Sequence, residues 1–169
     1  LRLTLTGYSQ YPPSQTREIY QRAQKLRSAL SERDRLLLDA LDPLVRSDPA
    51  DEKACAERLA ALAERFPGDA ELVELAGEYM NNRDARIASA RAALAIDPHY
   101  SDAFQLIAST RRWQGQLDAS RAALDECILA APNSIDCLQE RMEIARSEGR
   151  CEELEESAAV SDGQGLSDT

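Results

Sequence analysis

The sequence has few aromatic residues and no long apolar run. Only 5% of its 169 residues are Phe, Trp or Tyr, although 43% are hydrophobic, and alanine and leucine are prominent among these. Small and aliphatic side chains of this kind bury helix against helix, because they let helix axes approach closely. No apolar stretch approaches the ~18 residues that a membrane helix needs, so we expect no membrane insertion by this segment.

Basic residues are also in deficit. Lys and Arg number 20 against 30 Asp and Glu, which gives a formal net charge of -10. Such a surface repels phosphate backbones, so we expect no nucleic-acid partner. The chain begins with Leu1 rather than Met and carries no recognisable signal peptide, which favours an excised or processed fragment.

Motifs for catalysis and for cofactors are missing as well. The sequence has no glycine-rich nucleotide loop and no Asp-x-Asp-x-Asp-Gly calcium pattern. The one histidine, His99, lies in the turn DPHY, where a solvated turn residue is a simpler interpretation than a catalytic base. Acidic residues are scattered along helix faces rather than paired. Cys151, which follows Arg150, is the best candidate for a reactive thiol. We therefore expect no enzyme activity, no metal and no cofactor.

The sequence does contain helical periodicity, beginning near residue 16. We predict Thr16 as an N-cap and Ser31, with Asp34, as a second one. Pro43 should kink or shorten the helix that follows Ser31. Asp48-Pro49 predicts the start of the next helix, which should end near Phe66.

Turn signals divide the rest of the chain into further helices. Asp69 should cap one helix and Ser101 another, and Gly115 should end a helix in the left-handed conformation. The predicted helices span about 70–81, 85–96, 102–113, 117–130, 135–147 and 151–159. We predict an extended N-terminal segment at 1–15, a helical repeat domain at 16–159 and a flexible tail at 160–169.

The turn prolines recur at a nearly constant interval. Pro98 and Pro132 are 34 residues apart, and Pro67 precedes Pro98 by three residues fewer. A period near 34 with two helices per unit is typical of an α-solenoid, because a lone hairpin cannot cover its own apolar face. We therefore predict an all-α solenoid of stacked antiparallel helix hairpins, with about three to four repeats and an N-terminal helix.

The segment 101–134 resembles one complete tetratricopeptide repeat (TPR). The residues that match the TPR pattern are Phe104, Ile107, Ala108, Gly115, Leu124 and Pro132. The segment departs from that pattern at Arg111, where the family prefers tyrosine, and at Ser120 and Cys127, where it prefers alanine. Residues 69–98 also resemble a TPR unit, while residues 31–67 and the segment from Ile135 onward are weaker matches.

This resemblance implies a binding groove. In TPR proteins the first helices of successive hairpins line a concave surface that holds a protein or peptide. The corresponding residues here are Asp102, Gln105, Ser109, Arg112, Trp113, Asp136, Gln139, Glu143 and Arg146. Trp113 beside Arg112 is the most interesting pair, because Trp and Arg are frequent at binding hot spots. The alternative is that Trp113 packs over the turn at Gly115.

The function that the resemblance implies is a non-enzymatic protein-interaction or sensory scaffold, with self-association as a second mode. Two stretches also resemble the TPR region that follows the catalytic domain in bacterial serine/threonine kinases of the myxobacterial type. They are LRSALSERDRLLLDALDPLV and LAALAERFPGDAELVELAG. Similar segments occur in large bacterial transcriptional regulators. No kinase catalytic motif is present in this chain, so a kinase domain would belong to the rest of a longer protein.

Cys127 and Cys137 lie at equal distances on either side of Pro132, in CILAAPNSIDC. On an antiparallel helix pair they would be level with each other, about 7 Å below the turn. Three interpretations remain open: two small buried side chains, a disulfide, and, least favoured, a metal site. A disulfide would place the protein outside the cytoplasm, as a stand-alone structural domain, while the other interpretations leave its location undecided.

Overall fold

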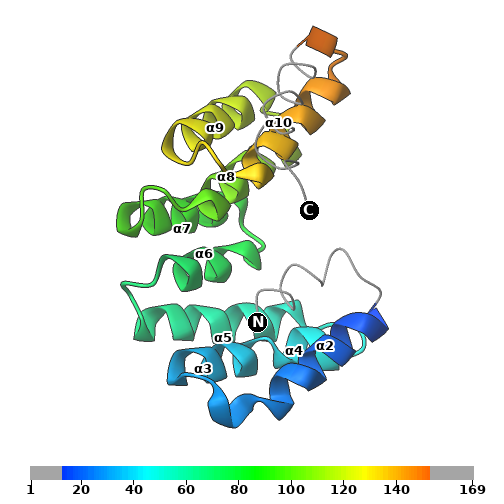
Figure 1. The fold of residues 1–169 in the computed structure, drawn as a ribbon, viewed down its shortest axis with the longest axis vertical. Coiled ribbons are helices and arrows are strands. Elements are labelled where there is room, and N and C mark those ends of the chain that lie inside the picture. The colour runs from blue at the N-terminus through cyan, green and yellow to red at the C-terminus, as the bar shows by residue number, and fades with distance from the viewer. Residues whose placement is uncertain (1–12, 153–169) are drawn as a thin grey trace, which may run out of the picture. The chain divides into compact units, whose positions relative to one another are not determined.

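We describe the fold from a computed structural model, which describes residues 13–152. Every regular element in this range is helical (Figure 1). The chain divides into two compact units, which we call unit 1 (Leu1–Pro67) and unit 2 (Gly68–Thr169). Residues 1–12 of the extended segment predicted at 1–15, the tail at 160–169 and most of the helix predicted at 151–159 lie outside the described residues. Residues 13–15 belong to a helix, so the extended prediction is wrong there.

Unit 1 is built from helices of unequal length. Its elements are α2 (Pro13–Lys25), the 3-10 helix η1 (Arg27–Ala29), α3 (Glu32–Ala40), α4 (Asp42–Arg46) and α5 (Glu52–Arg65). The division between α3 and α4 confirms the expected effect of Pro43, which occupies the first turn of α4, where no backbone N–H is needed. The largest fully buried side chains of this unit are Tyr20, Leu37, Leu38, Leu41, Leu44 and Leu59.

The predicted helix starts in unit 1 have mixed outcomes. Ser31 does cap α3, because its side chain accepts a hydrogen bond from the backbone N–H of Asp34. Thr16 is not a cap: it is buried inside α2, which begins at Pro13 because proline fits the first turn of a helix. The prediction for Asp48 is also wrong. Asp51 caps α5, whereas the Asp48 carboxylate lies 3.6 Å from the Arg17 guanidinium.

Unit 2 consists of five helices in regular succession. They are α6 (Ala70–Glu78), α7 (Arg83–Ile96), α8 (Ser101–Trp113), α9 (Leu117–Ala130) and α10 (Ile135–Ser147). Asp69 caps α6 as predicted, and Gly115 has a φ of 74°, which confirms the left-handed turn between α8 and α9. Ser101 is not a side-chain cap, because the helix already includes it and its hydroxyl lies 3.3 Å from the Asp102 carboxylate.

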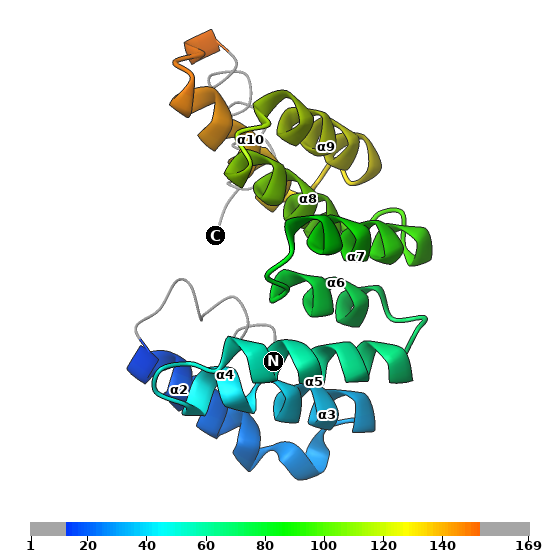
Figure 2. The same ribbon diagram turned by 180° about the vertical axis from the view of Figure 1, so that it is seen from behind.

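The helices of unit 2 form hairpins that pack against one another. Figures 1 and 2 both show α6 beside α7 and α8 beside α9, and α7 also packs against α8. Small residues make this packing close. A Cβ added to Gly77 would lie 2.5 Å from the Cβ of Ser89, so α6 and α7 meet at a distance that only glycine allows there. Within residues 13–152, no helix combines the length and apolar character that a membrane span requires.

One departure from the TPR pattern has a structural explanation. Ser120 of α9 is fully buried, and its hydroxyl donates a hydrogen bond of 2.7 Å to the backbone oxygen of Ala108 in α8. The serine therefore joins the two helices of the hairpin without leaving a buried hydroxyl unsatisfied.

Candidate functional site

The first helices of the hairpins in unit 2 are neighbours. Helix α8 contacts α6 on one side and α10 on the other, so these three helices form one layer. We call the exposed part of this layer the first-helix surface. One ion pair joins two of its helices: Arg112 Nε of α8 donates to Glu140 Oε1 of α10 over 2.7 Å. The predicted groove residues all lie on α8 and α10.

The residues predicted on α8 differ in exposure. Asp102, Gln105, Ser109 and Arg112 are partly buried, whereas Trp113 is 72% exposed. The Trp113 ring is therefore not part of the core. The Arg112 guanidinium lies 5.8 Å from the centre of the Trp113 ring, within the range of a cation–π interaction. The structure therefore brings Arg112 and Trp113 together.

The residues predicted on α10 are all exposed. They are Asp136, Gln139, Glu143 and Arg146. Arg146 pairs with Glu143 of its own helix at 2.7 Å, an exposed i, i+3 pair that contributes little stability. The contact between α8 and α10 instead uses Glu140, which the repeat resemblance did not point to.

Four carboxylates gather on α6 and the start of α8. We call Glu71, Glu74, Glu78 and Asp102 the acidic cluster. Glu74 is only 5% exposed. Burial, with smaller contributions from the charges of Glu78, Asp102 and Glu71, raises its pKa to about 8, while Arg86 acts to lower the pKa. The expectation that the acidic residues are scattered is therefore wrong on this helix.

Two other side chains adjoin the acidic cluster. The Tyr100 hydroxyl donates a hydrogen bond of 3.2 Å to Asp102, and burial followed by the nearby carboxylates raises the pKa of Tyr100. Nε of Arg86 is buried without a hydrogen-bond partner among the described residues. A sequence signal for this cluster exists in AELVELAGE, where three glutamates at i, i+3 and i+7 share one helix face.

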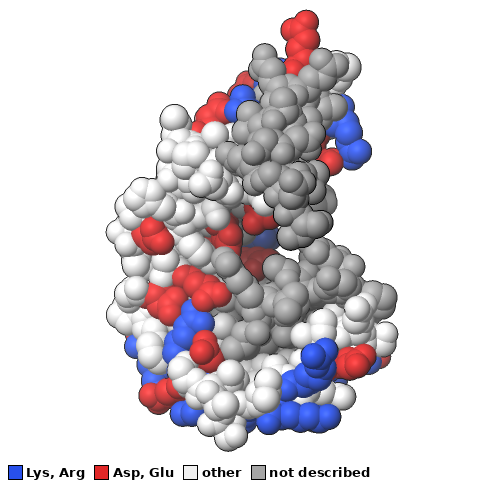
Figure 3. Space-filling view, viewed as in Figure 1, with Lys and Arg blue, Asp and Glu red and all other residues white. Residues whose placement is uncertain are grey.

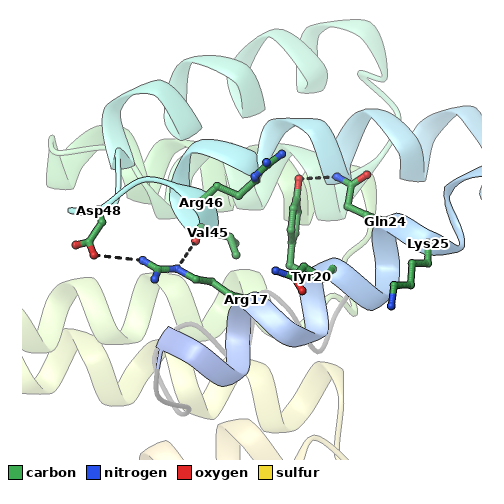
Figure 4. A pocket seen from close by; sticks show the side chains of 8 residues that line it. Arg17, Tyr20, Gln24, Lys25, Val45, Arg46 and Asp48 are labelled. Carbon is green, nitrogen blue, oxygen red and sulfur yellow. Dashed lines mark hydrogen bonds and ion pairs between the residues drawn. The ribbon is translucent and has the colours of Figure 1, made fainter.

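Unit 1 contains a pocket of about 590 Å³ between α2 and the segment around α4 (Figure 4). Its lining includes the basic side chains of Arg17, Lys25 and Arg46. Arg17 already donates to the backbone oxygen of Val45 over 3.1 Å and lies near Asp48. The Tyr20 hydroxyl donates to Asp42 over 2.8 Å, and burial is the main cause that raises its pKa to about 12. These contacts hold α2 against α4.

Cys127 and Cys137 are joined by a disulfide in the structure, with a Cα–Cα distance of 6.4 Å. Both are fully buried, and the bridge links α9 to α10. Cys55 is buried and Cys151 is exposed, and neither takes part in this bridge. Among the described residues, no three His, Cys, Asp or Glu side chains are arranged to hold a metal ion. His99 is exposed in its turn.

Comparison with known proteins bears on the fold. No protein-family model matches the chain, and no curated protein sequence is significantly similar to it. Ten chains of solved structures are similar. One is described as the crystal structure of MamA, a TPR-containing protein, with a TM-score of 0.60 and 17% identity over 88% of this chain and 86% of that chain.

The fold is TPR-like. The similarity to MamA, together with the hairpins of unit 2, confirms the predicted all-α class of stacked helix hairpins. At 17% identity the likeness concerns the fold alone.

Proposed function

We propose that this chain is a non-catalytic protein-interaction module that binds a peptide or protein segment on its first-helix surface. Stacked helical repeats form extended surfaces that proteins use for binding. The predicted groove residues Asp102, Gln105, Ser109, Arg112, Trp113, Asp136, Gln139, Glu143 and Arg146 belong to this proposal.

One observation carries the proposal. Trp113 is 72% exposed at the end of α8, although a large aromatic ring gains most by burial. Arg112 lies against the same ring and is held in place by Glu140 from the next first helix. An exposed tryptophan beside an ordered arginine has the composition of a binding hot spot, where a partner would remove the ring from water.

A selection experiment tests this function without knowledge of the partner. Peptides would be selected from a random library on the immobilised protein, and their affinities measured for Trp113→Ala. We expect this substitution to weaken binding at least about tenfold, as hot-spot truncations do. Because the side chain is exposed, the variant should keep its stability.

Leu129→Ala is the matched control for this substitution. Leu129 is 82% exposed and also large and apolar, but it lies on α9, a second helix. Selected peptides should bind this variant as tightly as the unaltered protein. Peptides that lose affinity for Leu129→Ala and not for Trp113→Ala would contradict the proposal.

We also propose that the module belongs to a larger bacterial signalling protein, such as a serine/threonine kinase. The support is the sequence resemblance of residues 26–45 and 59–77 to kinase-associated TPR regions. The full open reading frame tests it: a kinase domain upstream would support this origin, and a DNA-binding domain would favour a transcriptional regulator instead.

A second candidate function is favoured by the disulfide between α9 and α10. It is a disulfide-stabilised structural domain that works outside the cytoplasm, where such bridges persist. Counting thiols in protein isolated from its native compartment distinguishes the two. Two thiols among the four cysteines would support an oxidising location, and four would exclude it.

A further inference from the structure

The pocket between α2 and α4 has the size of a small-molecule site. Its volume is about 590 Å³, and known ligand pockets range from roughly 300 to 1,000 Å³. The described residues that line it all belong to unit 1, on α2 or between Val45 and Asp48. Hydrogen bonds fix these walls, because Arg17 donates to the backbone oxygen of Val45 and the Tyr20 hydroxyl donates to Asp42. The pocket is therefore built into the fold of unit 1.

The described lining of this pocket has more basic than acidic side chains. The cations are Arg17, Lys25 and Arg46, and the carboxylate is that of Asp48. Figure 4 shows Arg17 and Lys25 at opposite ends of the α2 wall, with Arg46 on the wall that α4 forms. This excess of positive charge favours a ligand of negative charge.

The charge of unit 1 also differs from that of the chain as a whole, which has a formal net charge of -10. Between residues 13 and 67, Lys and Arg equal Asp and Glu in number, whereas acids outnumber bases between residues 68 and 152. Figure 3 shows Lys and Arg side chains along the lower edge of the face drawn, where Figure 1 places α2 and α3. The surface of unit 1 therefore repels an anion less strongly than the charge of the whole chain would suggest.

Two of the pocket cations contribute little to the fold. Arg46 lies 3.5 Å from Asp42 and its side chain is 70% exposed, so this ion pair adds little stability. Lys25 is exposed and forms no hydrogen bond or ion pair with a described residue. Arg17 is held more firmly, by its hydrogen bond to the backbone and by Asp48 at 3.6 Å. The charges of Lys25 and Arg46 are therefore available to a ligand.

We propose that this pocket binds a small organic molecule that bears a carboxylate or phosphate group. Guanidinium and ammonium groups donate charge-assisted hydrogen bonds to such oxyanions, and a guanidinium can donate two in parallel. Gln21 and Gln24, which also line the pocket, can bond the uncharged polar atoms of the same molecule. This binding function is separate from the one proposed for the first-helix surface, because the pocket lies in unit 1 alone.

The spacing of the α2 residues indicates the length of the ligand. Arg17, Gln21 and Lys25 follow one another at intervals of four residues, so they share one face of the helix. The helical rise places the first and the last about 12 Å apart along the axis. A molecule with an oxyanion group at each end can therefore contact cations at both ends of the pocket, and it should bind more tightly than a molecule with one such group.

The test is an NMR titration of the full chain with four anions, in buffer whose ionic strength is held constant with sodium chloride. Acetate and adipate are the carboxylate probes, and inorganic phosphate and tripolyphosphate are the phosphate probes. The second member of each pair carries charge at both ends. The amides of α2 and of residues 42–48 should shift, and the longer probes should bind at millimolar concentration or below. Comparison of the two pairs shows which oxyanion the pocket prefers.

Lys25→Gln and Arg46→Gln should each weaken binding of the preferred probe about tenfold, because each removes a charge-assisted contact. Both side chains are exposed, so both variants should fold. Arg22→Gln is the matched control: Arg22 is exposed on the same helix and carries the same charge, but it does not line the pocket. This variant should bind the probe like the unaltered protein. An equal loss of affinity in Arg22→Gln and Lys25→Gln would mean that anions gather on the surface of α2, and it would overturn the inference.

Two other outcomes would also overturn the inference. One is that none of the four anions shifts the amides of α2 and residues 42–48. The other is that a polyglutamate peptide shifts them while the small anions do not, which would assign the pocket to an acidic protein segment. The variant Trp113→Ala should bind the anions unchanged, so failure of this inference leaves the function proposed for the first-helix surface untouched.

Discussion

The two units of this chain use different means to bury their helices. In unit 2, helices of 9, 14, 13, 14 and 13 residues alternate with short turns, and alanine, glycine and serine lie at the contacts. In unit 1, helices of 13, 9, 5 and 14 residues and one 3-10 turn are joined by side-chain ion pairs. Ion pairs between helices occur in both units, as Arg27–Asp39 in unit 1 and Arg112–Glu140 in unit 2 show, so the difference lies in helix length and in the residues at the helix contacts.

The acidic residues show the same contrast. In unit 1, Asp39 accepts two hydrogen bonds from Arg27, at 2.5 and 2.6 Å, and these bonds lower its pKa. In unit 2, Glu74 is buried beside other acids and its pKa is raised. The fold therefore favours the charged form of Asp39 and the neutral form of Glu74.

The largest effect should come from cavities in the two cores. Leu124→Ala in unit 2 and Leu38→Ala in unit 1 each remove a fully buried side chain, which should cost about 2–5 kcal/mol of unfolding free energy. Hydrogen exchange would locate the loss. Leu124→Ala should speed exchange between Gly68 and Glu152, and Leu38→Ala between Pro13 and Pro67. Equal acceleration everywhere in both variants would mean that the two units unfold as one.

The next largest effect on stability should come from Glu74, and it should depend on pH. Glu74 has a higher pKa in the folded chain than the 4.5 of an exposed glutamate, so the folded state holds its proton more tightly. The contribution of the Glu74 carboxyl to the unfolding free energy is therefore fully present below pH 4.5, and it is lost as the pH rises toward about 8. Glu74→Gln should therefore match the unaltered protein near pH 4.5 and exceed its stability by about 5 kcal/mol at pH 9. Urea unfolding at both values checks this, and a constant difference would contradict it.

The disulfide should stabilise unit 2 alone. Closing a loop with a sequence separation of 10 residues restricts the unfolded chain, which contributes about 2–3 kcal/mol. Reduction with dithiothreitol should lower the unfolding free energy of the unaltered protein by this amount. The double variant Cys127→Ala with Cys137→Ala should not respond to the reductant. If dithiothreitol lowered the unfolding free energy of the double variant by the same amount, the loss of stability would not come from this disulfide.

Substitution of two turn glycines in unit 2 should change stability by smaller and unequal amounts. Gly115 has a φ of 74°, a conformation that costs a residue with a Cβ about 1 kcal/mol. Gly68 has open space around it and no positive φ. Thermal unfolding should therefore show a loss for Gly115→Ala and almost none for Gly68→Ala. Equal losses would mean that the left-handed turn is not needed to place α9 beside α8.

The smallest effect should be that of Asp39→Asn in unit 1. The lowered pKa of Asp39 means that its contribution is present above the ordinary value of 3.8 and is lost as the pH falls through the folded value. Asp39→Asn should be slightly less stable than the unaltered protein at pH 7 and equal to it near pH 2. The effect is small because both side chains of the Arg27 pair are partly exposed to water. A difference that persists at pH 2 would exclude the ion pair as its cause.

The sequence predicted unit 2 better than unit 1 for a physical reason. Pro67, Gly115 and Pro132 act locally, so the turns they impose can be identified from their neighbours alone. The start of α5 was misplaced because Asp48 and Asp51 have equal capping ability, and only the tertiary contact of Asp48 with Arg17 separates them.

The candidate site was partly predictable for the same reason. The repeat pattern predicts that Arg112 and Trp113 lie on the first helix of a hairpin. It does not predict the exposure of the Trp113 ring, because that depends on how α8 ends. The acidic cluster was missed because the burial of Glu74 and its approach to Asp102 arise only when α6 and α8 pack together. The helical period of the sequence predicts which residues share one face of a helix. It does not predict which residues of a neighbouring helix lie opposite that face, and the pKa of a buried group depends on those residues.

Amide chemical-shift mapping with a peptide selected from the random library tests the central claim most directly. If the first-helix surface is the binding surface, the largest shifts will fall on α6, α8 and α10, with the Trp113 indole N–H among them. Shifts concentrated on α7 and α9, or around the pocket of Arg17 and Tyr20 in unit 1, would contradict it.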